Sequence, residues 1–368
     1  MSTEQEQQAA ALAQEKETKK LLAKKILEAK CKEESEFQVV KDIGAALNNG
    51  DNLEMKILSG GETNFSYKVY LKNDPSKRFF AKLTFEKALW NPDPTVKYDL
   101  SRVDNEFQIM NDFADHMGGH GQAPVAQPFY VIDIDPSKND GQAAKLLVAE
   151  WSPADEQFSN QFVDGKVDPR VIKGLAVALA KLNLTPVVEA EWNQDCRSCF
   201  RSLHPVFKQI YGGFMALPDE QSDAAVKRCK ELGLEALDQM IDNMDTEYME
   251  CRQVLNHNDT KQFNVLVEPP VKGDNGESSF GENGSFAICD WEMSVKGKSG
   301  KDVGVFWAWN LACAVCHAAQ GNEKEARHLL QTALDFWNEY AAVLKQAGKD
   351  DAYVIDTLRG AFGGAYLY

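Results

Sequence analysis

One segment in the second half of the chain combines the side chains that phosphoryl transfer requires. Residues 254–267 read H-x-D-x-x-x-x-N and continue into an apolar run, and the polar positions are His257, Asp259 and Asn264. In phosphoryl transfer an Asp orients the attacking hydroxyl group and accepts its proton, and an Asn can hold Mg²⁺ on the phosphate oxygens. The spacing allows one turn to direct Asp259 and Asn264 toward the same site.

A second motif follows after a short polar loop. Residues 286–292 read F-A-I-C-D-W-E, an apolar strand that ends in Asp290 and Glu292. If the strand continues through them, both acids point to the same side, because side chains alternate along a strand. Two carboxylates beside an amide oxygen suit Mg²⁺. Each motif alone is common in loops or at strand ends, but both in this order are rare, so we interpret them as one catalytic set.

The first half of the chain contains features that predict contacts to a nucleotide. A glycine turn, Ser59-Gly-Gly-Glu-Thr-Asn, lies between two strand-like runs, where its backbone N–H groups could cover phosphates. Lys82 lies on the next apolar strand; it either points to solvent or contacts phosphates and pairs with a helical acid, for which Glu106 is the first candidate and Asp104 the second. The predicted nucleotide-binding residues are Ser59, Gly60, Gly61, Thr63, Asn64, Lys82, Glu106 and Glu150.

The remaining pattern predicts an α+β fold with two lobes. Alternating apolar and polar residues predict strands over 53–58 and 65–71, and short apolar runs predict further strands over 79–85, 129–134 and 145–150. Helical periodicity predicts helices over 100–116, 168–182, 200–216, 223–243 and 324–347. We therefore predict three parts: a charged helical extension over 1–35, an antiparallel sheet lobe over 36–150 that clamps the nucleotide, and a mainly helical lobe over 151–368 with the catalytic loop, metal site and acceptor pocket.

Composition limits the partners. The chain has 56 acidic and 40 basic residues, a formal charge of −16, which argues against nucleic acid as a partner. No apolar run reaches the roughly 18 residues that span a membrane, and the start lacks a secretory signal, so we expect no membrane insertion and a cytoplasmic protein.

The pairs Cys196/Cys199 and Cys313/Cys316 are better explained as buried reduced thiols than as zinc or haem sites. A homodimer remains open.

These motifs, in this order over roughly residues 50–310, resemble those of the choline kinase and aminoglycoside phosphotransferase superfamily, which has a protein-kinase-like fold. The resemblance implies ATP and Mg²⁺ as cofactors and a hydroxyl group of a small molecule as acceptor. It implies Asp259 as catalytic base, Asn264 and Asp290 as magnesium ligands, and Lys82 as a phosphate contact.

Further positions match the same superfamily. Glu292 matches the acid that follows the metal-binding Asp in many small-molecule kinases, and His257 is expected to support the catalytic loop. The stretch from Gly297 to Phe306 resembles G-x-x-G-x-D-x-G-x-F, in which Asp302 braces the catalytic loop. A helix N-cap is the alternative role for Asp302.

The sequence determines the identity of the acceptor less closely than it determines the catalytic residues. The glycine turn and His257-Asn-Asp resemble choline or ethanolamine kinases, whereas the stretch after Asp290 resembles methylthioribose kinases. Aromatic rings could form a cage for a quaternary ammonium group or could be core. The candidate acceptor-pocket residues are Trp291, Trp307, Trp309, Trp337, Tyr340 and Arg359. We favour a choline- or ethanolamine-like amino alcohol; methylthioribose or another sugar, and a catalytically inactive kinase-like binding protein, are the alternatives.

Overall fold

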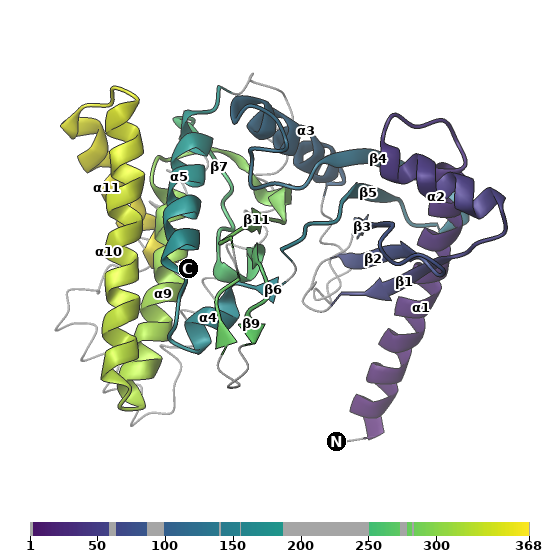
Figure 1. Ribbon diagram of the computed structural model, residues 1–368, viewed down its shortest axis with the longest axis horizontal. Coiled ribbons are helices and arrows are strands. Elements are labelled where there is room, and N and C mark those ends of the chain that lie inside the picture. Colours follow the sequence, from purple (N-terminus) through teal and green to yellow (C-terminus); the bar gives the residue numbers. More distant parts are fainter. Residues whose placement is uncertain are drawn as a thin grey trace. The chain divides into compact units, whose positions relative to one another are not determined.

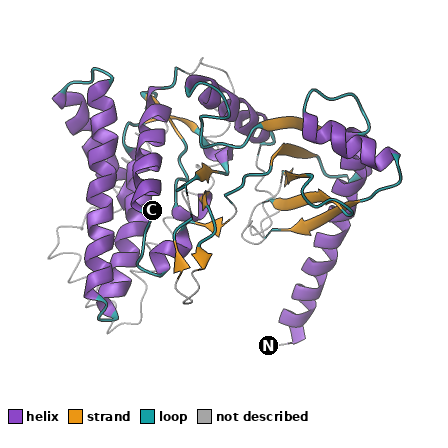
Figure 2. Cartoon of the chain, viewed as in Figure 1, coloured by secondary structure: helices purple, strands orange, loops and turns teal. Residues whose placement is uncertain are grey.

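The computed structural model divides into two compact units, Met1–Asn111 with Ala126–Ser152, and Asp112–Val125 with Pro153–Tyr368. It describes residues 3–58, 64–86, 99–139, 141–154, 156–186, 250–272, 278–281 and 283–367 (Figures 1 and 2). The helices predicted over 200–216 and 223–243 lie outside this part of the chain. So do Ser59, Gly60, Gly61, Thr63, Cys196 and Cys199. The division into two units places the predicted extension 1–35 in unit 1. It places residues 112–125, which we predicted from the sequence to belong to the first lobe, in unit 2.

Unit 1 is built on a five-stranded antiparallel sheet with the strand order β1-β2-β3-β5-β4. The strands are β1 (Leu53–Ile57), β2 (Phe65–Leu71), β3 (Arg78–Phe85), β4 (Pro128–Ile134) and β5 (Ala144–Glu150). All five strand predictions are confirmed within one residue at each end. Helix α3 (Ser101–His116) was also predicted, whereas α2 (Gln38–Asn48) was not. Together with the helices of unit 2, this sheet confirms the predicted α+β fold class.

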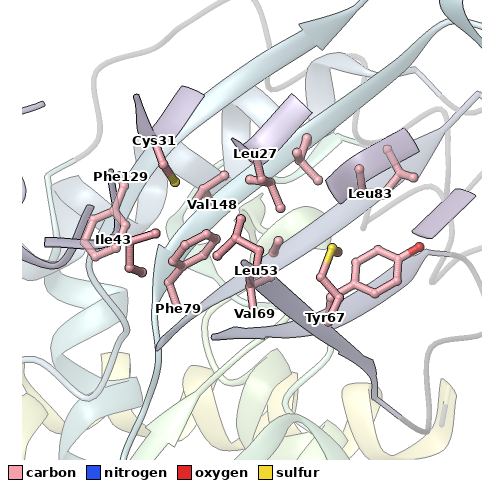
Figure 3. Close-up of a cluster of buried hydrophobic side chains, with 14 of the residues drawn as sticks. Leu27, Cys31, Ile43, Leu53, Tyr67, Val69, Phe79, Leu83, Phe129 and Val148 are labelled. Atoms are coloured by element: carbon pink, nitrogen blue, oxygen red, sulfur yellow. The ribbon is translucent and has the colours of Figure 1, made fainter. Parts of the chain in front are cut away.

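One face of the sheet forms the core of unit 1 together with α1 (Thr3–Cys31) and α2. Leu27 of α1, Ile43 of α2 and Leu83 of β3 belong to this buried cluster (Figure 3). Because side chains alternate along β3, Lys82 lies on the opposite face from Leu83. The core therefore determines which face of the sheet carries the predicted phosphate-binding lysine.

The charged helix α1 is part of this core rather than a separate extension. Its residues Ala23, Leu27 and Cys31 are buried, and burial raises the pKa of the Cys31 thiol to about 12. The Lys19 ammonium group is also buried and donates to Asn139 Oδ1 at 2.8 Å. A helix with few apolar residues can still pack into a core when those residues share one face of the helix.

The described part of unit 2 consists mainly of helices. They are α4 (Ser159–Val163), α5 (Pro169–Leu184), α9 (Lys301–Ala319), α10 (Glu323–Gln346) and α11 (Asp351–Leu367). The predictions over 168–182 and 324–347 are confirmed; α11 was not predicted. Helix α5 begins where Pro169 follows the N-cap Asp168, whose side chain accepts from Arg170 N at 2.9 Å. No helix in the described part of the chain is long and apolar enough to cross a membrane.

Short strands in unit 2 bring the two predicted catalytic motifs together. They are β6 (Glu156–Gln157), β7 (Val254–Asn256), β8 (Val265–Val267), β9 (Val271–Lys272), β10 (Ser278–Ser279), β11 (Phe286–Ile288) and β12 (Val295–Gly297). Strands β8 and β11 pair antiparallel, with Val265 opposite Ile288. The end of the first motif therefore lies beside the start of the second.

Helix α11 packs on the beginning of α9 through small residues. A Cβ atom added to Gly300 would lie 2.0 Å from Thr357 O, and one added to Gly304 would lie 2.2 Å from Ala361 O. Gly300 also has a φ of +87°, which favours glycine. The hydroxyl groups of Ser299 and Thr357 are 2.8 Å apart and hydrogen-bond across this contact. Only glycine allows such a close approach of the two backbones.

The second cysteine pair lies one turn apart on α9. Cys313 and Cys316 are free thiols, as expected. Cys313 is half-buried, and its burial raises the pKa of the thiol. Cys316 is exposed, so the prediction that both are buried is wrong. Both cysteines lie within the regular helix α9. Residues three apart on a helix point in similar but not identical directions, so one can be half-buried while the other is exposed.

Candidate active site

The first group of predicted site residues lies in unit 1 and centres on a buried ion pair. Lys82 Nζ is 2.9 Å from Glu106 Oε2, and both side chains are at most 5% exposed. Lys82 occupies the central strand β3, between Ser66 of β2 and Leu147 of β5 in register. The second candidate partner, Asp104, is instead 2.6 Å from Lys145 Nζ and half exposed. The structure therefore pairs Lys82 with the first candidate.

The two acids of α3 should differ sharply in their effect on stability. Glu106→Gln removes the carboxylate that contacts the buried Lys82 ammonium group, so we expect the free energy of unfolding to fall by about 3–5 kcal/mol. Asp104→Asn weakens an exposed pair and should cost less than about 1 kcal/mol. Urea denaturation of the two variants beside wild type measures both values. Equal losses would show that Lys82 does not depend on Glu106 for its burial.

A buried arginine next to this pair was not predicted. Arg102 is 2% exposed; its Nη2 donates to Phe85 O at 3.1 Å and to Asn64 Oδ1 at 3.5 Å. Asn64, the last residue of the predicted phosphate-binding turn, is thereby connected to α3. The signal in the sequence was the spacing of Arg102 and Glu106, since residues four apart share one face of a helix.

The last predicted nucleotide-binding residue of unit 1, Glu150, ends β5. Its side chain is exposed, and its backbone N–H donates to Gln127 O at 2.8 Å. The strand is therefore fixed up to its last residue by backbone pairing, while the carboxylate itself faces solvent.

The predicted catalytic loop of unit 2, residues 257–264, is held by Asp302. Its Oδ2 accepts from His257 N and its Oδ1 from Asn258 N, both at 2.8 Å. Thr260 Oγ1 donates to the backbone oxygen of Asp302 at 2.9 Å. Complete burial raises the pKa of this carboxyl group, while His257 and the two backbone N–H donors act in the opposite direction. Asp302 braces the loop; the N-cap of α9 is Gly300, so the N-cap alternative is wrong.

His257 connects the two catalytic motifs. Its Nδ1 accepts from Asp259 N at 3.3 Å, so Nε2 carries the proton and donates to Cys289 O at 3.1 Å. The imidazole is fully buried, and its ring contacts the Trp291 ring with centroids 4.7 Å apart. The residue therefore supports the loop and connects it to the segment that leads to Asp290.

Asp259 and Asn264 meet at the centre of the loop. Asn264 Nδ2 is 2.7 Å from Asp259 Oδ2 and 2.9 Å from its backbone oxygen. Because the amide NH₂ group faces Asp259, the amide oxygen of Asn264 points the other way. Cys289 N donates to Asn264 O at 2.9 Å, which brings the segment that ends in Asp290 alongside. Oxygen atoms of this kind are the ligands that Mg²⁺ prefers.

The second motif does not have the predicted strand geometry. Strand β11 ends at Ile288, and Asp290 has φ 65° and ψ 58°, a left-handed conformation that is rare for residues with a side chain. A 3₁₀ turn over Trp291–Met293 follows, with Glu292 buried in it. Asp290 and Glu292 are therefore not aligned by strand alternation. Such strained residues are concentrated at functional sites.

The charges around the loop act on Asp259. Burial is the main cause that raises the pKa of this carboxyl group above its ordinary value, and the negative charge of Asp290 adds to it. Lys261 and the Asn264 hydrogen bond lower it.

The described residues contain no cluster of three or more His, Cys, Asp or Glu side chains that could bind a metal by themselves. The donor set of Asn264 and Asp290 suits an ion that keeps part of its water shell, as Mg²⁺ does.

Comparison with known proteins identifies the family. A model of the phosphotransferase enzyme family (APH) matches residues 54–337, which include both groups of site residues. The chain belongs to the phosphotransferase enzyme family. This confirms the superfamily that the sequence motifs indicated. A search of curated proteins found no significant match.

Solved structures of phosphotransferases show low identity to this member of the family. A glucosamine kinase is 12% identical with a TM-score of 0.47, and the match covers 88% of this chain and 78% of that one. Aminoglycoside phosphotransferase APH(3'')-Id from Streptomyces rimosus, in complex with ADP and streptomycin, is 11% identical with a TM-score of 0.42, covering 89% and 99%. The aminoglycoside phosphotransferase from Alicyclobacillus acidocaldarius is 14% identical with a TM-score of 0.37, covering 85% and 89%.

Most aromatic candidates for the acceptor pocket of this phosphotransferase are core residues. Trp291 and Tyr340 are fully buried and Trp307 is 8% exposed. Their polar groups are bonded internally: Trp291 Nε1 to Ile288 O at 2.9 Å, Trp307 Nε1 to Ala333 O at 3.0 Å, and the Tyr340 hydroxyl to Asn183 Oδ1. Rings enclosed in this way have no face left for a ligand. The structure does not gather the six candidates into one cage.

The other candidates differ from these. Trp337 is half-buried and stacks on Tyr340, and Arg359 is exposed on α11. Trp309 is half-buried, with its ring 5.0 Å from that of Phe263. Phe263 was not predicted as a site residue. It precedes Asn264 in the catalytic loop and is 38% exposed, and an aromatic residue inside a polar loop motif was the signal for it.

Proposed function

We propose that this phosphotransferase is an ATP- and Mg²⁺-dependent kinase that phosphorylates a hydroxyl group of a small metabolite. The observation that carries the proposal is the loop in which Asp259 receives the Asn264 amide while buried Asp302 fixes the loop backbone. Phosphoryl transfer asks the protein mainly for positioning and electrostatic stabilisation, and a braced carboxylate beside a metal ligand provides both. In this assignment Asp259 is the catalytic base.

The residues that would hold the nucleotide and the metal belong to the two groups described above. Asn264, through its amide oxygen, and Asp290 would bind Mg²⁺, with Glu292 next to them. Bound Mg²⁺ supplies positive charge that neutralises the phosphate oxygens during transfer. Lys82 would contact phosphates, and its ion pair with Glu106 at 2.9 Å holds the ammonium group in place. The glycine turn over residues 59–64 and Glu150 complete the proposed nucleotide contacts.

For the acceptor we propose an amino alcohol of the choline or ethanolamine type. Of the aromatic residues in the described part of unit 2, Phe263 and Trp309 combine partial exposure with a position in or against the loop over residues 257–264. An edge-to-face aromatic pair offers a ring face that attracts a substituted ammonium group. A sugar such as methylthioribose is the second candidate, because the enclosed rings of Trp291 and Tyr340 leave less aromatic surface than a complete cage requires.

Turnover of a panel of acceptors tests this function. Purified protein with Mg·ATP is incubated with choline, ethanolamine, methylthioribose, glucosamine, an aminoglycoside or no acceptor, and ADP release is followed. We expect acceptor-dependent ADP release that disappears when EDTA removes Mg²⁺, with an amino alcohol as the best substrate. A sugar as the best substrate would select the second candidate. ATP binding without turnover on any acceptor would instead support an inactive binding protein.

A further inference from the structure

Lys261 contacts the proposed catalytic base directly. Its Nζ is 3.1 Å from Asp259 Oδ2, the same oxygen that accepts from Asn264 Nδ2 at 2.7 Å. Among the described residues no hydrogen bond or ion pair is made to the other oxygen, Oδ1. A carboxylate with both donors on one oxygen has a fixed orientation, and its second oxygen remains available for a further donor.

The backbone around Lys261 explains why its side chain turns back to Asp259. On one side Thr260 is fixed to Asp302 through its hydroxyl group; on the other, Gln262 Nε2 donates to Phe306 O at 3.0 Å. Lys261 lies between these anchors in an extended conformation, with φ −64° and ψ 153°, and its carbonyl accepts from Asn264 N at 2.9 Å. The loop therefore closes as a short turn with its lysine beside its aspartate.

Stability alone does not account for this ion pair. The side chains of Lys261 and Asp259 are 33% and 13% exposed. A pair that water reaches in this way contributes at most about 1 kcal/mol to folding. In a chain with a formal charge of −16, a cation held next to the base has more effect on the local geometry and charge of the loop than on the stability of the fold.

We propose that Lys261 is a positioning residue for Asp259. Together with Asn264 it holds Oδ2, so that Oδ1 faces the hydroxyl group of the acceptor and accepts its proton as the new O–P bond forms and ADP leaves. This inference rests on the proposed kinase function. It assigns a role to a residue that neither the sequence motifs nor the family match distinguishes.

Steady-state kinetics of Lys261→Met and Lys261→Arg test the inference. Misplacement of a reacting group by about 1 Å can cost about 10²-fold in rate, so for Lys261→Met we expect kcat to fall by about 10- to 100-fold. The KM values for ATP and for the acceptor should stay near those of wild type, because the lysine binds neither. Lys261→Arg should restore most of the rate. The control is Lys173→Met, which removes an exposed lysine paired with Glu339 at 3.5 Å and should leave kcat unchanged.

Three results would overturn the inference. The first is a wild-type kcat in Lys261→Met, and the second is a loss that appears only as a higher KM for ATP, which would make Lys261 a phosphate contact. The third is a loss that Lys261→Arg does not reverse. If wild type is active and Lys261→Met equals it, only this inference fails. If folded wild type turns over no acceptor, the proposed function fails and this role with it.

Discussion

Replacement of Asp259 by asparagine is expected to lower kcat by about 10²–10⁴-fold, the contribution of a positioned general base. Asparagine keeps the shape of the side chain and can still accept from Asn264 and Lys261, but it cannot take a proton from the acceptor. Affinity for Mg·ATP should change little, because the proposed nucleotide and metal contacts lie on other residues. Single-turnover assays and calorimetric titration with Mg·ADP measure the two quantities separately.

The pKa of Asp259 predicts how this variant affects folding. Burial raises the pKa of the Asp259 carboxyl group in the folded protein above its value in the unfolded chain. The ionised carboxylate is then disfavoured in the folded state, so this group lowers stability as the pH rises from the unfolded pKa through the raised folded pKa. The cost is absent below the unfolded pKa. Asp259→Asn removes it, so without Mg²⁺ the free energy of unfolding at pH 7 should not fall through this effect.

A matched control separates catalysis from folding. Asp335 is an exposed acid on α10 that accepts from Gln331 at 2.8 Å, and Asp335→Asn should leave kcat and stability unchanged. If Asp259→Asn unfolds the protein as well as stopping turnover, Asp259 is a structural residue and its assignment as the base is wrong.

Gly304→Ala is expected to lower both stability and activity. The added Cβ atom would lie 2.2 Å from Ala361 O and 2.4 Å from Ala365 N, both backbone atoms of α11. Real Cβ atoms do not approach backbone so closely, so α11 must move away from α9. Overpacking of this kind costs about 1–3 kcal/mol or more, which urea denaturation would detect. Activity should fall too, because Asp302, which braces the catalytic loop, lies on the first turn of α9.

The control for this prediction is another glycine of unit 2. A Cβ atom on Gly121 meets nothing within 4 Å and the residue does not need a positive φ, so Gly121→Ala should be neutral. Limited proteolysis should release α11 faster from Gly304→Ala than from either Gly121→Ala or wild type. Wild-type stability of Gly304→Ala would mean that the packing of α11 on α9 is looser than these distances indicate.

The features that the sequence determined by itself are local. Strands β1 and β2 follow from the alternation of apolar and polar residues, which needs only the two-residue repeat of an extended chain. The contact between Asp259 and Asn264 follows from their spacing within one short turn. Family membership follows in the same way, because the order of short motifs along the chain carries it.

The tertiary structure decided everything that depends on residues distant in sequence. Whether Lys82 faces solvent or Glu106 depends on which face of the sheet α1 and α2 cover, and whether Trp291 is a pocket wall or core depends on what encloses it. The left-handed conformation of Asp290 and the packing of α11 against Gly304 are likewise fixed by neighbouring segments. Periodicity in a sequence reports which residues share a face, but burial is a property of what packs against that face.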